Sequence, residues 1–336
     1  MGLIYIGAFP PKWGGVTVKN NDVYNELIAK GLPIKKINIG KIKRDKSIFE
    51  CISLVTALMG RDNRLIIGVS AASRRSFVRL LHAVNRKAMN RSIMLVMGGA
   101  AAREIADDRD DRKRMSEFKR IYVETQGMRH LLAESGMKNV SVYPNCRKMR
   151  MQCTRTKKES EKLQCVFFSL IQKEKGVAEI IESAGKLPNV DFSFYGHIDN
   201  EYLDEFMRNI ERLPNCTYKG VFRGTEESKY RELSKYDIML LPTKWDREGI
   251  PGILVEAKIA GLSCIVSNVS YNAEIVQDNI DGIVLASNDS SCLTEAIRSL
   301  DEDREMLEKQ KEESSKSADN YYMENYIDSI IHDIQE

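Results

Sequence analysis

The chain has 336 residues and no long hydrophobic run. Its longest uncharged apolar stretches, 51–60 and 92–102, are too short to cross a bilayer. The first ten residues, MGLIYIGAFP, have no basic lead before a long apolar segment, so we expect no secretory signal. Seven scattered cysteines form no C-x-x-C pair, which argues against a zinc site or a disulfide framework and favours a reducing compartment. We therefore predict a cytoplasmic location.

Other signatures are also missing. Only four histidines occur, at positions 82, 130, 197 and 332, and they lack the spacing of metal ligands. The sequence contains no G-x-G-x-x-G, which disfavours a dinucleotide oxidoreductase. Two D-x-D triplets, 108–110 and 301–303, match a metal-binding motif but lie in charged segments rather than after an apolar strand. We interpret them as solvated faces and expect no metal and no resident cofactor.

The net charge of +3 hides an asymmetry between the two halves of the chain. Residues 1–160 carry 32 Lys and Arg against 14 Asp and Glu, a balance of +18, whereas residues 161–336 have a balance of −15. The basic half suits an anionic surface, whether a membrane, a nucleic acid or an acidic ligand. Charge alone does not decide between them. A nucleic-acid partner is not expected, because the sequence has no recognised binding module and no aromatic stacking platform.

Short apolar runs alternate with helical patterns along both halves. We expect strands at 3–9, 33–39, 64–70, 92–98, 119–124, 139–144, 165–171, 190–196, 216–221, 237–243, 263–268 and 282–286. We expect helices at 17–30, 47–59, 74–90, 175–186, 200–212, 225–234, 251–260, 272–277, 289–299 and 321–336. One more helix is expected after the strand at 119–124, ending at residue 135. This alternation is typical of parallel βαβ units, so the predicted fold class is α/β.

The pattern restarts after 146–163, a charged segment without apolar periodicity that we interpret as a linker. We therefore expect a first domain over 1–150, a second over 160–318 and a final helix over 319–336. One stripe of this helix is apolar and predicts a packed face; it comprises Met323, Tyr326, Ile327, Ile330, Ile331 and Ile334. Ligands of open parallel sheets bind at the carboxyl ends of the strands, here expected in a cleft between two lobes.

The helix expected at 74–90 has two contrasting faces. One face carries Arg75, Arg79, His82 and Arg86, and the opposite face carries Phe77, Leu81, Val84 and Ala88. The simpler interpretation is a core-packed helix with a solvated basic face. The alternative is a surface that contacts anionic lipid, which the basic first half of the chain supports.

The most specific feature is the segment 245–266, which combines two glutamates with a glycine-rich turn. Glu248 and Glu256 are separated by the seven residues that include Gly249, Ile250, Pro251 and Gly252. An apolar strand leads into the turn, and Pro251 suits the first turn of a helix. Such a helix start points backbone N–H groups at a ligand and suits phosphate. Taken alone, the two glutamates could equally be a loop residue and a carboxylate stabilised by the helix dipole.

In its context, EGIPGILVEAKIAGLSCIV, this E-x7-E spacing resembles the retaining, nucleotide-sugar-dependent group 1 glycosyltransferases of the GT-B fold. Further matching segments are IGAFPPKWGGVTVKN (6–20), FFSLIQKEKG (167–176), FYGHID (194–199) and SNVSYNAEIVQDNIDGIVL (267–285). VMGGAAAREI, IYVETQGMRHLL and VYPNC resemble the branch found in bacterial capsule and exopolysaccharide loci. The resemblance covers nearly the whole chain. It implies two Rossmann-like lobes facing a central cleft, with the last helix crossing back to the first lobe.

The resemblance implies a role for each matched residue of the second domain. Glu256 would hold the ribose hydroxyls, Glu248 would contact the donor sugar, and the backbone from Gly249 to Gly252 would meet the sugar or the phosphates. Lys175 would neutralise the departing diphosphate, which makes Lys175 and Glu248 the predicted catalytic residues. Fixed donors of this kind stabilise developing charge without a metal.

Four residues in two other loops are implied as donor contacts. Gly14 and Gly15, at a helix start in the first domain, would let the backbone approach the β-phosphate, although a plain turn is the alternative. Gly196 and His197 lie on the expected cleft side, where His197 would touch donor phosphate; an ordinary loop histidine is the alternative.

The sequence departs from the family pattern at one position. The family usually has an arginine five residues before Lys175, where this chain has Leu170, and leucine cannot grip a phosphate. Arg223 or Lys244 could substitute, donor binding could be weak, or the chain could be a catalytically degenerate GT-B partner that stabilises an active transferase.

The predicted function is therefore sugar transfer from a nucleotide-diphosphate sugar to a glycan or lipid-linked acceptor, with retention, in bacterial surface polysaccharide synthesis. Because members of the resembled family commonly use UDP-sugars, UDP is the nucleotide that the resemblance implies. The expected location is cytoplasmic, with the basic half as a candidate for peripheral contact at the inner face of the plasma membrane.

Overall fold

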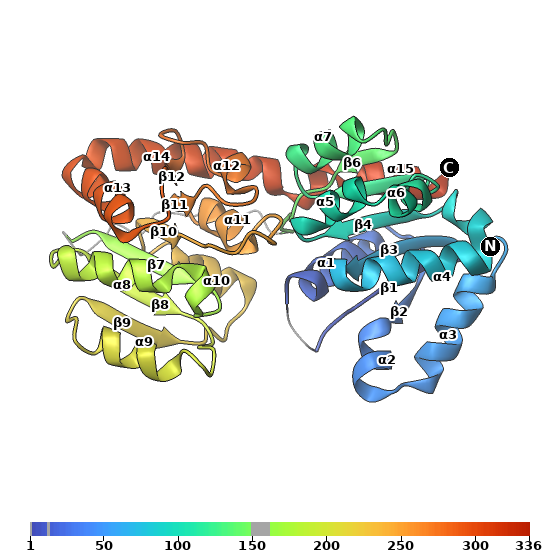
Figure 1. Cartoon of the computed structure of the whole chain (residues 1–336), viewed down its shortest axis with the longest axis horizontal. Coiled ribbons are helices and arrows are strands. Elements are labelled where there is room, and N and C mark those ends of the chain that lie inside the picture. Colours follow the sequence, from blue (N-terminus) through green and yellow to red (C-terminus); the bar gives the residue numbers. More distant parts are fainter. Residues whose placement is uncertain (1, 12–13, 149–161) are drawn as a thin grey trace. The chain divides into compact units, whose positions relative to one another are not determined.

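The computed structural model describes residues 2–11, 14–148 and 162–336 (Figure 1). Contacts within the chain divide these residues into two units. Unit 1 contains the described residues up to Lys148 together with 247–250 and 322–336, and unit 2 contains 162–246 and 251–321. Most of the predicted linker, 146–163, lies outside the described residues.

Unit 1 is built on six parallel strands in the order β2-β1-β3-β4-β5-β6. The strands are β1 (Leu3–Gly7), β2 (Ile34–Asn38), β3 (Arg64–Ser70), β4 (Ile93–Met97), β5 (Arg120–Val123) and β6 (Val140–Val142). The helices are α1 (Gly15–Ala29), α2 (Ile39–Asp45), α3 (Ile48–Met59), α4 (Ala71–Met89), α5 (Ala100–Asp107), α6 (Arg109–Met115), α7 (Gln126–Glu134) and α15 (Ile327–Gln335), with the 3₁₀ turn η3 (Met323–Asn325) before α15.

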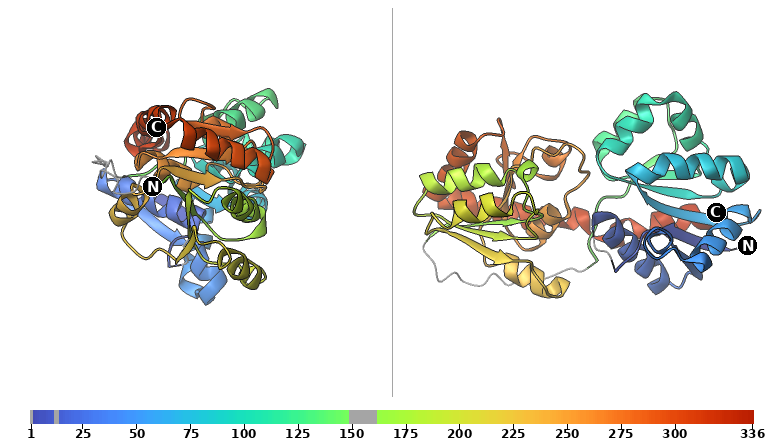
Figure 2. Two further views of the ribbon diagram at one scale, coloured as in Figure 1. Left: turned by 90° about the vertical axis from the view of Figure 1, so that its left-hand side faces the viewer. Right: turned by 60° about the horizontal axis from the view of Figure 1, so that its bottom comes forward.

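Unit 2 repeats the same construction in the order β12-β11-β10-β7-β8-β9. Its strands are β7 (Gln164–Phe168), β8 (Asp191–Tyr195), β9 (Cys216–Gly220), β10 (Ile238–Leu241), β11 (Ser263–Ser267) and β12 (Gly282–Leu285). Its helices are α8 (Val177–Lys186), α9 (Leu203–Ile210), α10 (Glu226–Leu233), α11 (Gly252–Ile259), α12 (Asn272–Ile275), α13 (Ser290–Glu302) and α14 (Arg304–Ser317), with 3₁₀ turns η1 (Lys173–Lys175) and η2 (Ala318–Tyr321). Helices cover each sheet (Figure 2), which confirms the predicted α/β class with two parallel sheets.

The C-terminal helix completes the core of unit 1. Side chains such as Tyr5 and Leu95 leave one face of the sheet and enter a buried cluster. Helix α15 closes this cluster with Ile327, Ile330 and Ile334. The expected return of the last helix to the first lobe is therefore confirmed. Among the described residues, no helix is both long and apolar enough to span a bilayer.

Polar segments form helices that the periodicity did not predict. α5 and α6 occupy a segment expected to be irregular, and α14 occupies the charged run after residue 303. Asp108 caps α6 by accepting the N–H groups of Asp110 and Asp111, and Asp303 caps α14 by accepting that of Met306. These backbone hydrogen bonds hold the pKa of Asp108 below its usual value. Both D-x-D triplets therefore contribute a helix cap.

Helix α4 buries only part of the predicted apolar face: Leu81 and Ala88 are buried as predicted. Val84, predicted to lie in the core, is exposed, whereas Val78 and Arg74 are buried. Arg74 forms an ion pair with the equally buried Asp111, and a buried cation needs such a partner. The backbone leaves helical geometry at Asn85, so one stripe does not continue along the whole helix. The interpretation of α4 as a helix packed against the core is therefore confirmed, with a buried face that includes Arg74 and Val78 but not Val84.

We predict that Ile330→Ala destabilises unit 1 by about 2–5 kcal/mol, because it leaves a cavity under α15. Thermal and urea unfolding followed by circular dichroism would measure the loss. Ile280→Ala is the matched control, since Ile280 is 51% exposed and its truncation opens no cavity. Equal melting temperatures for the two variants would contradict the described docking of α15.

Candidate functional site

The sheet of unit 2 reverses its strand order between β7 and β10. The chain runs outward from β7 through β8 and β9, and then returns to build β10, β11 and β12 on the other side. β7 and β10 are neighbours, with Cys165 opposite Ile238. Ligands of open parallel sheets bind at such a switch position, beyond the carboxyl ends of the strands. The segments that leave β7 and β10 are therefore the candidate site of this unit.

Hydrogen bonds join the loops that follow β7 and β10. The Lys244 N–H donates to the Glu174 carbonyl at 2.7 Å, and the Thr243 hydroxyl donates to the same oxygen at 3.2 Å. The Ser267 hydroxyl, at the end of β11, donates to the Thr243 carbonyl at 2.5 Å. Three neighbouring strands thus hold their loops in one arrangement.

Lys175 lies within this arrangement and is buried. Gly176 follows it with a φ of 74°, and a Cβ there would overlap the Pro242 carbonyl. Both the backbone conformation and the close approach therefore require glycine. The Lys-Gly pair of the E-K-G segment thus places an ammonium group at the carboxyl edge of the sheet, where it suits an anionic ligand.

The loop after β8 is bound to the same edge. The Ile171 N–H donates to the His197 carbonyl at 2.9 Å, which ties this loop to the one after β7. Gly196 has a φ of 146°, and a Cβ there would overlap the Ser169 carbonyl. The imidazole of His197 is exposed. The structure therefore brings Gly196 and Lys175 to adjacent loops, while the roles of Gly196 and His197 remain predictions.

Glu256 lies on α11, the helix that follows β10. This helix begins at Gly252, and Pro251 is its N-cap residue rather than part of its first turn. The Glu256 side chain is buried and pairs with Lys229 of α10, with Nζ and Oε1 2.8 Å apart. As a carboxylate, Glu256 offers two oxygens that accept hydrogen bonds, the property required to hold hydroxyl groups.

A buried ion pair fixes the helix that carries Glu256. Lys258, two residues further along α11, is fully buried. Its ammonium contacts Asp281 at 2.6 Å and the Ser317 hydroxyl at 2.8 Å. Breaking such a pair leaves a buried charge without compensation, so α11 has little freedom to turn.

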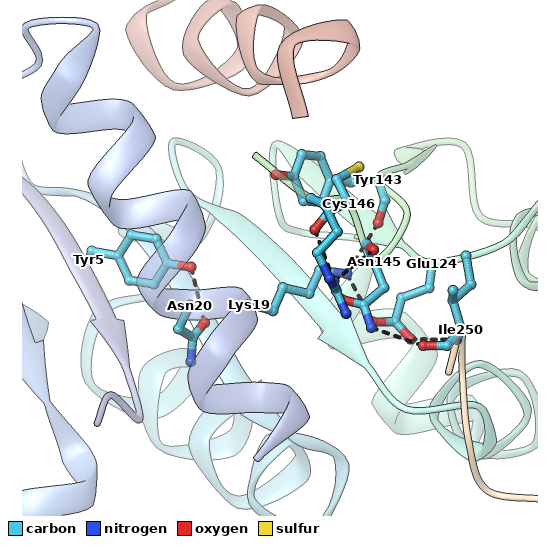
Figure 3. A network of polar contacts seen from close by, with 9 residues as sticks. Tyr5, Lys19, Asn20, Glu124, Tyr143, Asn145, Cys146 and Ile250 are labelled. Atoms are coloured by element: carbon cyan, nitrogen blue, oxygen red, sulfur yellow. Dashed lines mark hydrogen bonds and ion pairs between the residues drawn. The ribbon is translucent and has the colours of Figure 1, made fainter. Parts of the chain in front are cut away.

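The segment 247–250, which carries Glu248, belongs to unit 1 (Figure 3). The Ile250 N–H donates to Glu124 Oε2 at 3.3 Å, and the Asn145 amide donates to the Ile250 carbonyl at 2.9 Å. The Gly99 N–H donates to the Arg247 carbonyl at 2.9 Å. Loops after β4, β5 and β6 thus bind this segment through its backbone.

Glu124 is the centre of this network (Figure 3). Its Oε1 pairs with Lys19 of α1 at 2.9 Å, and Lys19 also donates to the Tyr143 carbonyl at 3.2 Å. Lys19 and Glu124 are both buried. A Cβ on Gly249 would overlap Glu124 Oε2, so this approach requires glycine. Glu248 is half-buried beside it.

Gly14 and Gly15 follow β1, where the strand order of unit 1 reverses between β1 and β3. Asn20 of α1 donates from its amide to the carbonyls of Ala8 and Gly68, which holds α1 at the ends of these strands. A Cβ on either glycine would meet no atom of the described residues within 4 Å. Packing among the described residues therefore does not demand glycine, and a close approach by a ligand remains the prediction.

Leu170, in place of the expected arginine, is exposed at the end of β7. Lys244, one candidate substitute, lies on the loop bonded to Glu174, and its ammonium pairs with Glu179 of α8. Arg223, the other candidate, follows β9 at the far edge of the sheet. Lys244 is thus the better placed of the two.

Three of the described cysteines have thiols with a raised pKa. Burial raises the pKa of Cys146, Cys216 and Cys264 to about 12. Above-normal pKa values keep these thiols neutral at physiological pH, and a neutral thiol is a poor nucleophile. They serve as packing residues.

Solved structures with the same fold identify the architectural class. HepE (Alr3699) of Anabaena, solved in complex with UDP, has a TM-score of 0.73 at 13% identity. The match covers 99% of this chain and 98% of HepE. Sucrose-phosphate synthase of Thermosynechococcus elongatus has a TM-score of 0.75 at 11% identity over the same shares. The fold is therefore that of the GT-B glycosyltransferases.

Sequence comparison shows a family resemblance within the C-terminal part of the chain. Residues 153–317 match the family described as glycosyl transferases group 1. The UDP-Gal:alpha-D-GlcNAc-diphosphoundecaprenol alpha-1,3-galactosyltransferase of Escherichia coli is 26% identical over 46% of this chain, and an uncharacterized 41.2 kDa protein of the Klebsiella pneumoniae cps region is 25% identical over 44%. These matches span 38% and 39% of the two relatives' own lengths. Residues 153–317 of this chain thus match the group 1 glycosyltransferases, and the fold of the chain is GT-B.

Motif analysis missed the residues that hold the matched ones in place. Lys229, Lys258 and Glu124 contact partners between 23 and 126 residues away in sequence, and none lies at a recognised spacing. The only available signal was position: Glu124 directly follows an apolar strand, where polar residues collect at the edge of a parallel sheet.

We predict that Glu124→Ala destabilises the protein by about 3–5 kcal/mol, because the buried Lys19 ammonium loses its carboxylate partner. Urea unfolding measures the loss, and Glu124→Gln should recover part of it by restoring a hydrogen-bond acceptor. Glu313→Ala removes an exposed pair with Lys316 and serves as the control with unchanged stability. Unchanged stability in Glu124→Ala as well would show that the Lys19–Glu124 pair does not form.

Proposed function

We propose that this protein transfers a sugar from a UDP-sugar to a hydroxyl of a glycan or lipid-linked acceptor, with retention and without a metal ion, in bacterial surface polysaccharide synthesis. One observation carries the proposal. Lys175 and Glu256, implied by the E-K-G and E-x7-E segments, lie on the segments that leave the two strands at the switch position of unit 2. Residues distant in sequence thereby lie on segments that follow neighbouring strands, where open α/β sheets bind their ligands.

Each donor-binding residue has a defined task in this proposal. Glu256 accepts hydrogen bonds from the ribose hydroxyls, and the N-terminus of α11 at Gly252 presents backbone N–H groups to phosphate. Lys175 neutralises the diphosphate as the bond between the anomeric carbon and its phosphate oxygen breaks and the electron pair leaves with the nucleotide. Glu248 orients the sugar hydroxyls so that the acceptor attaches on the face that the diphosphate vacates.

Relatives support the choice of donor and acceptor. Solved structures of similar fold contain UDP or UDP-glucose, and the E. coli relative is named for a UDP-Gal donor and a diphosphoundecaprenol-linked acceptor. The K. pneumoniae relative is encoded in a cps region. A lipid-linked acceptor in surface polysaccharide synthesis is consistent with these names.

The alternative of a catalytically degenerate partner subunit is less well supported. It rests on Leu170 in place of an arginine, which removes one expected cation. Lys175 keeps its buried position, Lys244 lies on the adjacent loop, and Glu256 keeps its place on α11. The positions of these three residues support the proposal of an active donor site.

We predict that UDP raises the melting temperature of the wild type and that Glu256→Ala removes this shift, because the ribose hydroxyls lose their acceptor. Ligand at about 100 times its Kd stabilises a protein by about 2.7 kcal/mol, which a thermal-shift assay resolves. GDP and ADP test the nucleotide, and Glu313→Ala is the control. A full shift in Glu256→Ala would rule out the ribose role.

We predict that Lys175→Ala lowers kcat by about 10²–10³-fold, as expected for loss of one stabilising charge on the leaving group. Lys173→Ala is a matched control, because Lys173 lies in the same turn with an exposed ammonium paired with Glu205. Proton NMR of the anomeric signal in the product distinguishes retention from inversion. No turnover by the purified wild type with any UDP-sugar would favour the partner-subunit alternative.

A further inference from the structure

Helix α3 of unit 1 turns apolar side chains outward. Ile48 and Phe49 are 75% and 74% exposed, and Ile52, Val55 and Met59 are exposed as well. At about 100° per residue, four of these five lie within a stripe about 60° wide, with Phe49 at its side. A surface helix ordinarily buries such a stripe.

The inner face of α3 is the more polar one. Ser53 and Ala57 are buried, and Glu50, the one charged residue of this fully described helix, points inward far enough to accept the Asn38 N–H at 3.1 Å. The outer face therefore carries no charge. Leu58 is buried as well, so Ser53, Ala57, Leu58 and Glu50 make the contacts with the rest of unit 1 and leave the exposed apolar residues outside that packing.

The neighbouring helix α4 also exposes apolar side chains. Leu80 and Val84, one turn apart, are exposed. The Asn85 amide donates to the carbonyls of Leu58 and Gly60 at 2.9 and 3.0 Å, which fixes α4 beside the end of α3. Figure 1 shows α2, α3 and α4 as neighbours in unit 1. We call Ile48, Phe49, Ile52, Val55, Met59, Leu80 and Val84 the α3–α4 patch.

Exposed cations border the α3–α4 patch. They are Lys41, Lys43, Arg44 and Lys46 before α3, and Arg79 and Lys87 on α4. Within the four-residue group before α3, Arg44 is paired with Asp45. Lys43 donates to the Ser73 hydroxyl of α4 at 3.0 Å, which brings α2 against the same surface.

Of the basic stripe predicted on α4, Arg79 borders this surface, whereas the other three residues face carboxylates. Arg75 lies 3.3 Å from Asp108, and Glu117 pairs with Arg86 and lies 3.5 Å from His82. Three of its four basic side chains thus face carboxylates, which reduces its attraction for an anionic surface. The cations around the α3–α4 patch border apolar residues instead.

We propose that the α3–α4 patch docks unit 1 on an anionic lipid bilayer, with α3 lying in the plane of the interface. The helix is about 18 Å long, its outer face enters the acyl boundary, and the surrounding lysines and arginines meet anionic headgroups. An uncharged apolar centre with a cationic border matches this combination of hydrocarbon and negative charge. The inference does not depend on the donor chemistry proposed for unit 2.

Vesicle sedimentation tests the proposal with the full chain. The vesicles contain phosphatidylcholine alone or in equal parts with phosphatidylglycerol. We expect the wild type to bind the anionic vesicles, Phe49→Glu with Ile52→Glu to bind about tenfold or more weakly, and Ile280→Glu, an exposed isoleucine of unit 2, to bind like the wild type. Replacing Lys41, Lys43 and Lys46 with Gln should cost about fivefold per cation and reduce the salt dependence.

Three controls accompany the sedimentation assay. Circular dichroism melting and the UDP thermal shift report whether each variant is folded and whether unit 2 is intact, and Phe49→Ser provides a milder variant. Equal vesicle binding by the wild type and the Phe49→Glu, Ile52→Glu variant would overturn the proposal, as would unchanged binding after lysine replacement. A wild-type dimer that these substitutions dissociate, without vesicle binding, would assign the patch to a second copy and overturn it as well.

Discussion

Burial of both faces of two parallel sheets is the constraint on which the rest of this structure depends. Strands such as β4 and β10 are buried along their whole length and contain only apolar residues. Polar groups that do chemistry therefore cannot lie within these strands. They are confined to the segments beyond the carboxyl ends, and the reversal of strand order between β7 and β10 concentrates Lys175 and Glu256 there.

Buried ion pairs convert this general arrangement into defined positions. Lys258 with Asp281 holds α11, and Lys19 with Glu124 holds the segment that includes Ile250. Such pairs contribute little net stability compared with apolar substitutes, because desolvation offsets most of their attraction. Their effect is directional: a side chain that must reach one partner fixes the helix or loop that carries it. Glu256 and Glu248, two of the residues matched to the family, lie on these fixed segments.

Apolar alternation predicted the strands well because a strand buried on both faces is a continuous apolar run that few other elements imitate. It failed for α5, and for α6 and α14, which have little apolar surface and begin at the caps Asp108 and Asp303. It also placed Val84 inside, whereas the structure leaves Val84 exposed and departs from helical geometry at the next residue, Asn85. Lys175 and Glu256 were accessible through motif spacing, whereas Glu124 and Lys229 required knowledge of which strands and helices are neighbours.

Helix α3 shows what a sequence pattern cannot predict, namely which surface an apolar stripe contacts. An apolar stripe predicts an amphipathic helix, but the stripe itself does not state whether it meets the protein core or something else. In α3 the choice is made by the opposite face, where Glu50 reaches the Asn38 N–H and Ser53 and Ala57 pack inward. Rotating the helix to bury Phe49 would break that hydrogen bond and expose the small residues that permit close packing. The exposed stripe is therefore a consequence of satisfied polar contacts inside, and its apolar character requires a cause outside the packing of this unit.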